Sequence, residues 1–278
     1  MCKSRNSMKK SIVKYYGITS DKIPPDTMPI RIAFISDLHN VCIGKHNKIL
    51  LDKIDALSPD LLLLGGDTFV AKPDHSMDIG LRFIKDLARH HQVYAANGNH
   101  EYRMRIYPEV YGTMYSRYQK QIEDSGVILL ENTTANIFIN HIPIAIHGLE
   151  LDRKYYHRFQ KPELPVKELK AYFGEPDDKT FHILLAHNPH YGKTYMNWEA
   201  DLTLSGHYHG GIIRTLKDQP LIGNDFQLFP PYAYGCFRCG SHTLITSAGM
   251  GEHTIPFRIN NPRELVVVDI HPTGNESL

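Results

Sequence analysis

Five apolar segments of the sequence end in side chains that can bind a metal ion or move a proton. In chain order they lead into Asp37-Leu38-His39, Gly66-Asp67, Gly98-Asn99-His100-Glu101, His187 and Gly206-His207-Tyr208-His209. One Asp or His in such a place is commonplace, but five in succession are not. Ligands of open α/β sheets bind at the carboxyl ends of the strands. The recurrence therefore predicts one functional site built from all five segments.

The donor atoms of this predicted site belong to carboxylates, an amide and imidazoles, without a thiolate. Such a set suits Mn²⁺, Fe or Zn²⁺ better than the all-oxygen cages of Ca²⁺. One ion would leave ligands unused, whereas two divalent ions that share a bridging carboxylate use all of them, as in two-metal phosphoryl hydrolases. We therefore expect a binuclear centre formed by Asp37, His39, Asp67, Asn99, His187, His207 and His209.

The two-residue spacing of Asp37 with His39, and of His207 with His209, predicts local chelates. Alternate side chains of an extended chain point to the same side. Each pair can therefore aim at one point while the residue between packs away.

The expected charge of the site favours a phosphate ester. Two divalent cations, less two aspartates and one bridging hydroxide, leave about one positive unit, which attracts an anionic substrate. The ions would lower the pKa of a bridging water to about 7 and so provide a hydroxide nucleophile. His100 follows a proposed ligand directly, so we expect it to reach the leaving-group oxygen or a nonbridging phosphoryl oxygen instead of the same metal.

The segments that position these residues read as a mixed α/β fold. Unalternated apolar runs predict buried strands, and apolar residues at helical spacing predict covering helices over 45–57 and 76–91. A Gly/Pro-rich region follows residue 212, and ELVVVDI at 264–270 reads as a closing strand. The expected motif strands are 30–36, 61–66, 93–98, 181–186 and 201–206.

Composition places the chain among folded globular proteins. It has 278 residues, with 31 Lys plus Arg against 30 Asp plus Glu, so a net charge of +1 offers no general hold on a nucleic acid. Without repeats or a low-complexity linker, we expect a single domain over 1–278. Its expected parts are an N-terminal extension at 1–29, the metal-site motifs at 30–212, and C-terminal strands and loops at 213–278.

The cysteines and the N-terminus favour a cytoplasmic protein. Cys2, Cys42, Cys236 and Cys239 are too few and too scattered for a disulfide framework. We interpret the C-x-x-C pair at 236 and 239 as loop thiols instead of a zinc or redox site. The N-terminus has no signal-peptide pattern, and no stretch is long and apolar enough to span a membrane. Its basic, Tyr-containing start leaves peripheral contact with a membrane or lipid open.

The motif series DLH, GGD, GNHE, LLAHNP and GHYHGG resembles the calcineurin-like metallophosphoesterase superfamily over residues 30–212. The resemblance implies a four-layer α/β/β/α sandwich of two mixed sheets flanked by helices. It implies that Asp37, His39 and His209 hold the first metal, and that Asn99, His187 and His207 hold the second. It further implies that Asp67 bridges the metals, that His100 is the catalytic histidine, and that Glu101 orients it.

The C-terminal region narrows the resemblance. The segments LTLSGHYHGGIIRT and SAGMGEHTIPFRINNPRELVVVDI look like the YkuE/YaeI-like phosphodiesterase branch. This implies phosphodiester cleavage, so we expect a metallophosphoesterase acting on phosphate esters, with diesters favoured. A phosphomonoesterase acting on phosphoproteins or small metabolites is the alternative. A non-catalytic scaffold is disfavoured because all eight site positions are present. The oligomeric state has no sequence signal.

Two segments rich in Arg and Tyr, 102–120 and 153–159, lie just after motif loops. They fit equally a substrate rim of aromatic and guanidinium groups and an ordinary surface that packs its Tyr rings while its Arg tips reach water. Other polar residues are expected outside the catalytic set. Packing or supporting roles are expected for Arg103, His147 and Asn188, and surface roles for His90, His91, His141, His242 and His271.

Overall fold

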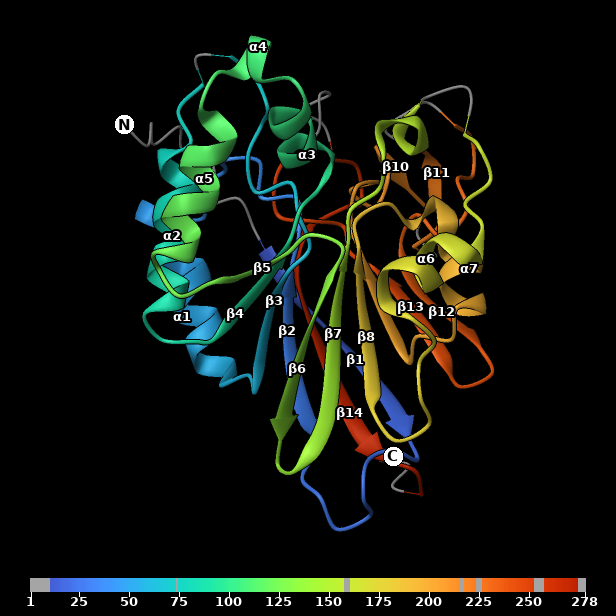
Figure 1. Ribbon diagram of the computed structural model, residues 1–278. Coiled ribbons are helices and arrows are strands. Elements are labelled where there is room, and N and C mark those ends of the chain that lie inside the picture. Colours follow the sequence, from blue (N-terminus) through green and yellow to red (C-terminus); the bar gives the residue numbers. More distant parts are fainter. Residues whose placement is uncertain are drawn as a thin grey trace.

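Two six-stranded sheets form the body of the protein (Figure 1). The computed structural model describes residues 11–73, 75–157, 161–215, 218–223, 227–252 and 258–274. The strands of the first sheet are β1 (Ser11–Ser20), β2 (Ile30–Ile35), β3 (Leu61–Leu64), β4 (Val93–Ala96), β5 (Ile128–Leu130) and β14 (Arg263–Pro272). Those of the second are β6 (Thr133–Ile139), β7 (Ile142–Leu149), β8 (Phe181–Ala186), β9 (Leu202–Ser205), β12 (Gly235–Cys239) and β13 (His242–Thr246).

Both sheets are mixed and carry their motif strands in parallel. The first has the order β1-β14-β2-β3-β4-β5, and the second has the order β12-β13-β9-β8-β7-β6. Strands β2, β3 and β4 run parallel to one another, as do β8 and β9. A small ribbon pairs β10 (Ile213–Arg214) with β11 (Pro220–Ile222).

Helices cover the outer face of each sheet. They are α1 (Lys48–Leu57), α2 (Asp78–Ala88), α3 (Asn99–Ile106), α4 (Pro108–Tyr111), α5 (Met114–Glu123), α6 (Val166–Phe173) and α7 (Gly192–Asn197). Figure 1 shows α1, α2 and α5 on the outer side of the first sheet and α6 and α7 on the outer side of the second. Short 3-10 turns occur at Lys45–Asn47, Arg153–Tyr156 and Pro189–Tyr191.

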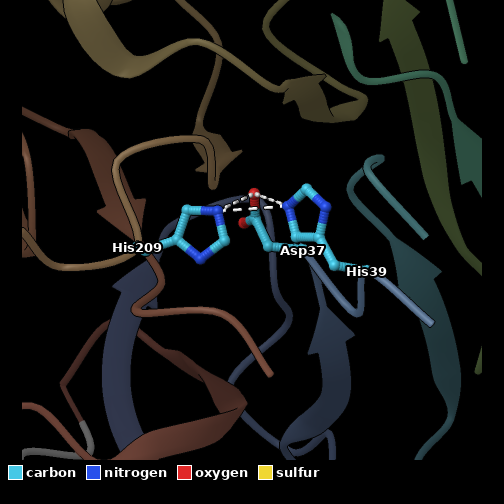
Figure 2. Close-up of side chains that lie close together, drawn as sticks. All are labelled: Asp37, His39 and His209. Atoms are coloured by element: carbon cyan, nitrogen blue, oxygen red, sulfur yellow. Dashed lines mark hydrogen bonds and ion pairs between the residues drawn. The ribbon is translucent and has the colours of Figure 1, made fainter. Parts of the chain in front are cut away.

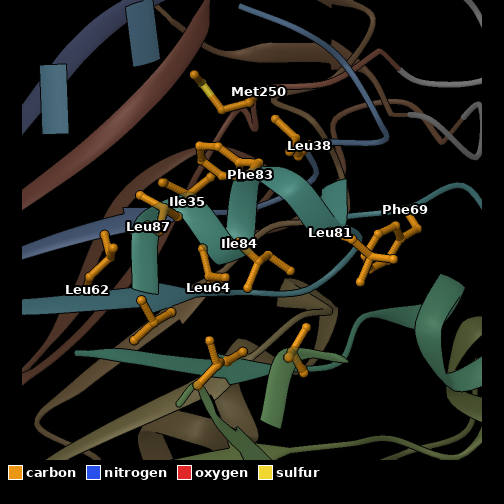
Figure 3. Close-up of a cluster of buried hydrophobic side chains, with 14 of the residues drawn as sticks. Ile35, Leu38, Leu62, Leu64, Phe69, Leu81, Phe83, Ile84, Leu87 and Met250 are labelled. Carbon is orange, nitrogen blue, oxygen red and sulfur yellow. The ribbon is translucent and has the colours of Figure 1, made fainter. Parts of the chain in front are cut away.

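Side-chain alternation along the strands creates the layers. On β2, Ile32 and Phe34 enter the core between the sheets, whereas Ala33 and Ile35 enter the core under the helices. Figure 3 shows this outer core, in which α2 packs its apolar face on β2 and β3. A third core lies between the second sheet and α6 and α7. The expected four-layer α/β/β/α sandwich is confirmed.

The expected elements are present, with shifts at their ends. Four of the five motif strands end one or two residues earlier than expected, because the chain turns before it reaches the site residues. The helix expected over 45–57 is a 3-10 turn followed by α1, and α2 is shorter than the expected 76–91. The segment expected to be an N-terminal extension supplies β1, which pairs in parallel with β14 over ten residues. Residues 1–10 lie outside the described part.

The C-x-x-C pair lies on a strand, not in a loop as expected. Cys236 and Cys239 are exposed free thiols on β12, which pairs with β13 from Gly235 to Cys239. Side chains three residues apart on a strand point to opposite faces, so this pair cannot chelate a metal or close a disulfide. Separately, none of the described helices combines the length and the apolar character needed to cross a membrane.

Candidate metal centre and active site

The loops that follow β2, β3, β4, β8 and β9 bring the predicted site residues together at one end of the two sheets. Asp37 and Asp67 follow adjacent parallel strands of the first sheet, and backbone hydrogen bonds join their loops. His187 and the loop with His207 and His209 follow adjacent parallel strands of the second sheet. The site therefore forms where the carboxyl ends of strands from two packed sheets meet.

Asp37, His39 and His209 form a first cluster (Figure 2). The His209 Nε2 atom lies 3.3 Å from Asp37 Oδ1, and the His39 Nε2 atom lies 3.8 Å from the same oxygen. The two imidazole nitrogens are 3.2 Å apart. Figure 2 shows the rings on either side of the Asp37 carboxylate, so three donor atoms converge on one point.

Asp67, His187 and His207 form a second cluster, and Asp67 connects it to the first. The Asp67 Oδ2 atom lies 3.2 Å from His187 Nε2 and 3.7 Å from His39 Nε2. The rings of His187 and His207 meet edge to face, with centroids 5.3 Å apart. Asp67 thus lies between the two histidine groups, which is the position a shared carboxylate requires.

Among the residues that the structure describes, two buried polar atoms at this centre have no hydrogen-bond partner. They are the Asn99 Oδ1 and the His187 Nε2. The other ring nitrogen of His187 donates to the Gly65 carbonyl oxygen at 2.7 Å, which leaves Nε2 facing the carboxylates. Buried polar atoms are nearly always paired, so these two atoms fit metal ligation.

The local backbone differs from the extended chain expected for the two motif pairs. Positive φ angles occur at five predicted ligands, namely Asp37 (52°), His39 (47°), Asp67 (53°), His207 (67°) and His209 (52°). Left-handed conformations of this kind carry strain and cluster at functional sites. The middle residues Leu38 and Tyr208 are buried as expected. His207 and His209, however, join different clusters and do not form one chelate.

Glycines make room for the two aspartates. A Cβ on Gly249, at φ +64°, would lie 2.7 Å from the Asp37 Cβ, and side chains on Gly206 and Gly98 would collide with the Asp37 and Asp67 carboxylates. Met250 and Gly251 donate backbone N–H groups to the Ser36 and Asp37 carbonyl oxygens. The carboxylates are therefore held in close-fitting backbone pockets.

The charges of the clusters are strongly coupled. Burial opposes the ionised form of Asp37, but the facing His209, His187 and His39 outweigh it and hold the Asp37 pKa below its usual range. Burial likewise lowers the pKa of His187, but Asp67 and Asp37 outweigh it and raise that pKa to about 10. The raised His187 pKa reflects the negative charge of the two aspartates, which is the field that cations need, and the lowered Asp37 pKa reflects the histidines that face it.

His100 borders the clusters, and its hydrogen bonds fix its tautomer. Its Nδ1 accepts the backbone N–H of Ala71 at 2.8 Å and lies 3.2 Å from Arg103 Nη2. Two donors at Nδ1 leave the ring proton on Nε2, which lies 3.9 Å from Asp67 Oδ2. Burial, helped by the charges of His39 and Arg103, lowers the His100 pKa to about 4 against the pull of Asp67. His100 is thus a neutral hydrogen-bond donor at neutral pH.

Glu101 orients the loop beneath the site, not His100 as the resemblance implied. Its carboxylate accepts the backbone N–H groups of Asp67 at 2.8 Å, Gly98 at 3.0 Å and Phe69 at 3.2 Å. Burial, together with the negative charge of Asp67, raises its pKa to about 7. Glu101 therefore ties the start of α3 to the loop that carries Asp67.

Sequence reasoning missed Arg258. Its guanidinium donates to the carbonyl oxygens of Ala248 (2.7 Å) and Gly251, and its Nη2 lies 3.3 Å from His209 Nδ1. It fastens the glycine loop that packs on Asp37. The only sequence signal was its place in the C-terminal segment that carries the branch resemblance. Residues 253–257 of that segment lie outside the described part.

The residues expected outside the catalytic set are placed accordingly. Asn188 is buried, and its side chain bonds the backbone of Tyr155 and His190. His147, on β7, packs its ring against Phe173 of α6 and against Trp198. Two of the other histidines bond residues away from the metal centre. His91 bonds Asp55, and His242 bonds the Ala200 carbonyl oxygen.

The family profile described as calcineurin-like phosphoesterase matches residues 30–211, a span that contains every residue of both clusters. The chain belongs to this family. It is therefore a metallophosphoesterase, a hydrolase of phosphoric esters that uses divalent metals. The recognition and the enzyme class expected from the motifs are confirmed.

Three relatives support the placement of this metallophosphoesterase. YpbG of Bacillus subtilis (strain 168) is 27% identical, over 87% of this chain and 81% of that protein. An uncharacterized metallophosphoesterase of Aquifex aeolicus (strain VF5) is 26% identical, over 95% of this chain and 93% of that protein. The metallophosphoesterase YkuE of Bacillus subtilis (strain 168) is 31% identical over 35% of this chain and 33% of that protein, which agrees with the branch expected from the C-terminal segment.

Proposed function

We propose that this metallophosphoesterase is a binuclear hydrolase that cleaves phosphodiesters in preference to monoesters. The observation that carries the proposal is the sharing of Asp67 between two histidine clusters, with the His100 Nε2–H beside them. The ligand assignment is Asp37, His39 and His209 for one ion, Asn99, His187 and His207 for the other, and Asp67 for both. Mn²⁺, Fe and Zn²⁺ all suit this set.

The chain's own residues then have distinct tasks. Bound divalent ions supply Lewis acidity and a water activated at neutral pH. Asp37 and Asp67 hold the positive charge in place, so that a phosphate group is drawn to the site. His100 donates its Nε2–H to an oxygen of the phosphoryl group or of the leaving group. A neutral donor stabilises developing negative charge without a full proton transfer.

The diester preference has a structural support. A pocket of about 350 Å³ opens beside the site and shares Asn99 with it. A diester carries an organic group on each side of phosphorus, and such a pocket can accommodate one of them while the other departs. A monoester has a single organic group, which is also its leaving group, so only a diester can keep one group in this pocket while a different group departs.

The experiment compares kcat/KM for bis-p-nitrophenyl phosphate and p-nitrophenyl phosphate on protein stripped by a chelator and reloaded with Mn²⁺. We expect the stripped protein to be inactive, reloading to restore activity, and the diester to be the better substrate. A higher kcat/KM for the monoester would establish the alternative function. Diester hydrolysis that survives complete metal removal would contradict the proposal as a whole.

We further propose that the enzyme works in the cytoplasm. The free thiols Cys236 and Cys239 lie exposed on β12, where an oxidising compartment would leave them open to intermolecular pairing. Fractionation of the source cells, with immunodetection of the chain in soluble and membrane fractions, tests this. Recovery with the membranes after a salt wash would contradict it.

A further inference from the structure

The pocket beside the metal centre has an unusual lining. It lies between α3 and the 3-10 turn Arg153–Tyr156, the two places where the sequence is rich in Arg and Tyr. Its walls are Asn99, Tyr102, Arg103, Ile106, Tyr107, Arg153, Tyr156 and His157. The lining therefore joins three phenol rings with two guanidinium groups and one imidazole.

The cationic groups of this pocket are available to a ligand. Within the described part of the chain, no carboxylate forms an ion pair with Arg103 or Arg153, although neighbouring Arg105 pairs with both Glu131 and Glu150. The Arg103 Nε is buried, and no described residue gives it a hydrogen-bond partner. The nearby carboxylate of Asp152 accepts the Tyr102 hydroxyl at 3.0 Å. The pocket thus offers unneutralised positive charge.

The aromatic groups are held in place. The Arg153 guanidinium lies over the Tyr107 ring, 5.0 Å from its centroid, and contacts the Tyr107 hydroxyl. The Tyr156 ring meets the His207 ring edge to face at 5.3 Å. Ordered rings and a stacked guanidinium form surfaces on which a planar group can stack at low entropic cost.

The pocket is continuous with the reacting centre. Asn99 belongs to its wall and to the proposed ligand set, and Tyr156 contacts His207. Arg103 reaches from the pocket wall to within 3.2 Å of the His100 Nδ1. A substituent of a phosphate held at the clusters would therefore enter this pocket.

We infer that the pocket selects phosphoesters whose organic group is a nucleoside, with the planar base held among the Tyr rings and the Arg153 and Arg103 guanidinium groups. This rests on the proposed function, because the pocket is used by a substrate held at the metals. A lipid tail is disfavoured, since Ile106 is the one aliphatic residue of the lining. The volume lies near the lower end of the roughly 300–1,000 Å³ typical of ligand pockets.

Binding to an impaired enzyme tests the inference without turnover. His100→Asn protein loaded with Mn²⁺ is titrated calorimetrically with AMP, inorganic phosphate and glycerophosphocholine. We expect AMP to bind at least about tenfold more tightly than phosphate, which is the gain of roughly one desolvated cation–π or stacking contact with the base. Adding Arg153→Gln should weaken AMP binding about tenfold and phosphate binding much less. Lys154→Gln is the matched control, since Lys154 is adjacent and cationic but outside the lining.

The outcomes separate this inference from the proposed function. Glycerophosphocholine binding as tightly as AMP, AMP binding no better than phosphate, or equal effects of the Arg153 and Lys154 variants would each overturn the nucleotide pocket. If the parent enzyme still hydrolyses bis-p-nitrophenyl phosphate, the proposed function stands. Conversely, Arg153-dependent AMP binding in an enzyme that hydrolyses no diester would support the pocket and refute the reaction.

Discussion

The protein contains two separate groups of buried histidines, and within each group the rings contact one another. One group lies at the candidate metal centre, and the other serves packing. At the strand ends, His39 and His209 approach to 3.2 Å beside Asp37. Inside the second sheet, His147 and His182 stack with their ring nitrogens 3.0 Å apart. Burial and histidine contact are thus the same in both places and do not identify a metal site.

The groups differ in what the ring nitrogens bond. In the internal pair, the Asp177 N–H donates to His182 Nε2, so His182 Nδ1–H donates to His147 Nε2, and His147 Nδ1 pairs with the Thr134 hydroxyl. Every nitrogen is satisfied while both rings are neutral. At the strand ends, the His187 Nε2 has no hydrogen-bond partner among the described residues and faces two carboxylates. A ring nitrogen that lacks such a partner and faces carboxylates distinguishes a ligand from a packing residue.

The largest effect that would test this contrast is expected for Asp67→Asn. The substitution preserves shape but removes the charge that both proposed ions share, so we expect kcat/KM to fall by about 10³-fold or more, since metal ions supply several kcal/mol of transition-state stabilisation. Metal analysis should show loss of about one ion per chain. His147→Gln is the matched control and should retain activity and metal. Equal losses of activity and metal in both variants would show that the two histidine groups do not differ in metal binding.

Next in size is His100→Asn. Removal of the Nε2–H donor should lower kcat by roughly 10²-fold to 10³-fold, the usual cost of one such donor. Both metals should remain, because His100 is not in the proposed ligand set. Steady-state kinetics combined with metal analysis provides the check. Loss of a metal in this variant would show that His100 is a ligand.

A smaller effect is expected on stability when metal is added to the stripped enzyme. Cations relieve the repulsion between Asp37 and Asp67 and bind only the folded state, so a metal at 100 times its Kd should stabilise by about 2.7 kcal/mol. That corresponds to roughly 5 °C in Tm for a chain of 278 residues. Calorimetry should show the same shift in His147→Gln and a reduced one in His187→Gln. An unreduced shift in the latter would remove His187 from the site.

The smallest effect is the pH dependence that the internal pair imposes. Burial, with the charge of His182, lowers the pKa of His147 to about 3. The unfolded chain, with a His pKa near 6.5, then binds more protons than the native protein, so stability falls as pH drops from about 6.5 toward 3. The slope is at most about 1.4 kcal/mol per pH unit. Urea unfolding at pH 7 and pH 5 should show a smaller decrease for His147→Gln than for the parent, and an identical decrease would contradict the neutral pair.

Much of the fold was predictable because its signals are local. Apolar runs marked β2, β3, β4, β8 and β9, and helical spacing marked α1 and α2. Strand β1 escaped notice because its burial pattern mixes buried and exposed residues at a sheet edge. The motif strands ended early because positive φ angles at Asp37 and Asp67 turn the chain out of the sheet, and residue types alone do not reveal such turns.

The sequence by itself determined the donor set and its order, because each motif is a short segment with its own composition. Only the tertiary structure decided which donors meet. His39 and His209 are 170 residues apart and come into contact only because two sheets pack with their strand ends aligned. Within the first layer, the loop after β3 brings the Ala71 N–H to the His100 Nδ1, where it joins Arg103 from the next turn of α3 and fixes the ring proton. Spacing along a chain constrains neighbours in sequence, whereas contacts between sheets depend on how all the layers bury their apolar faces.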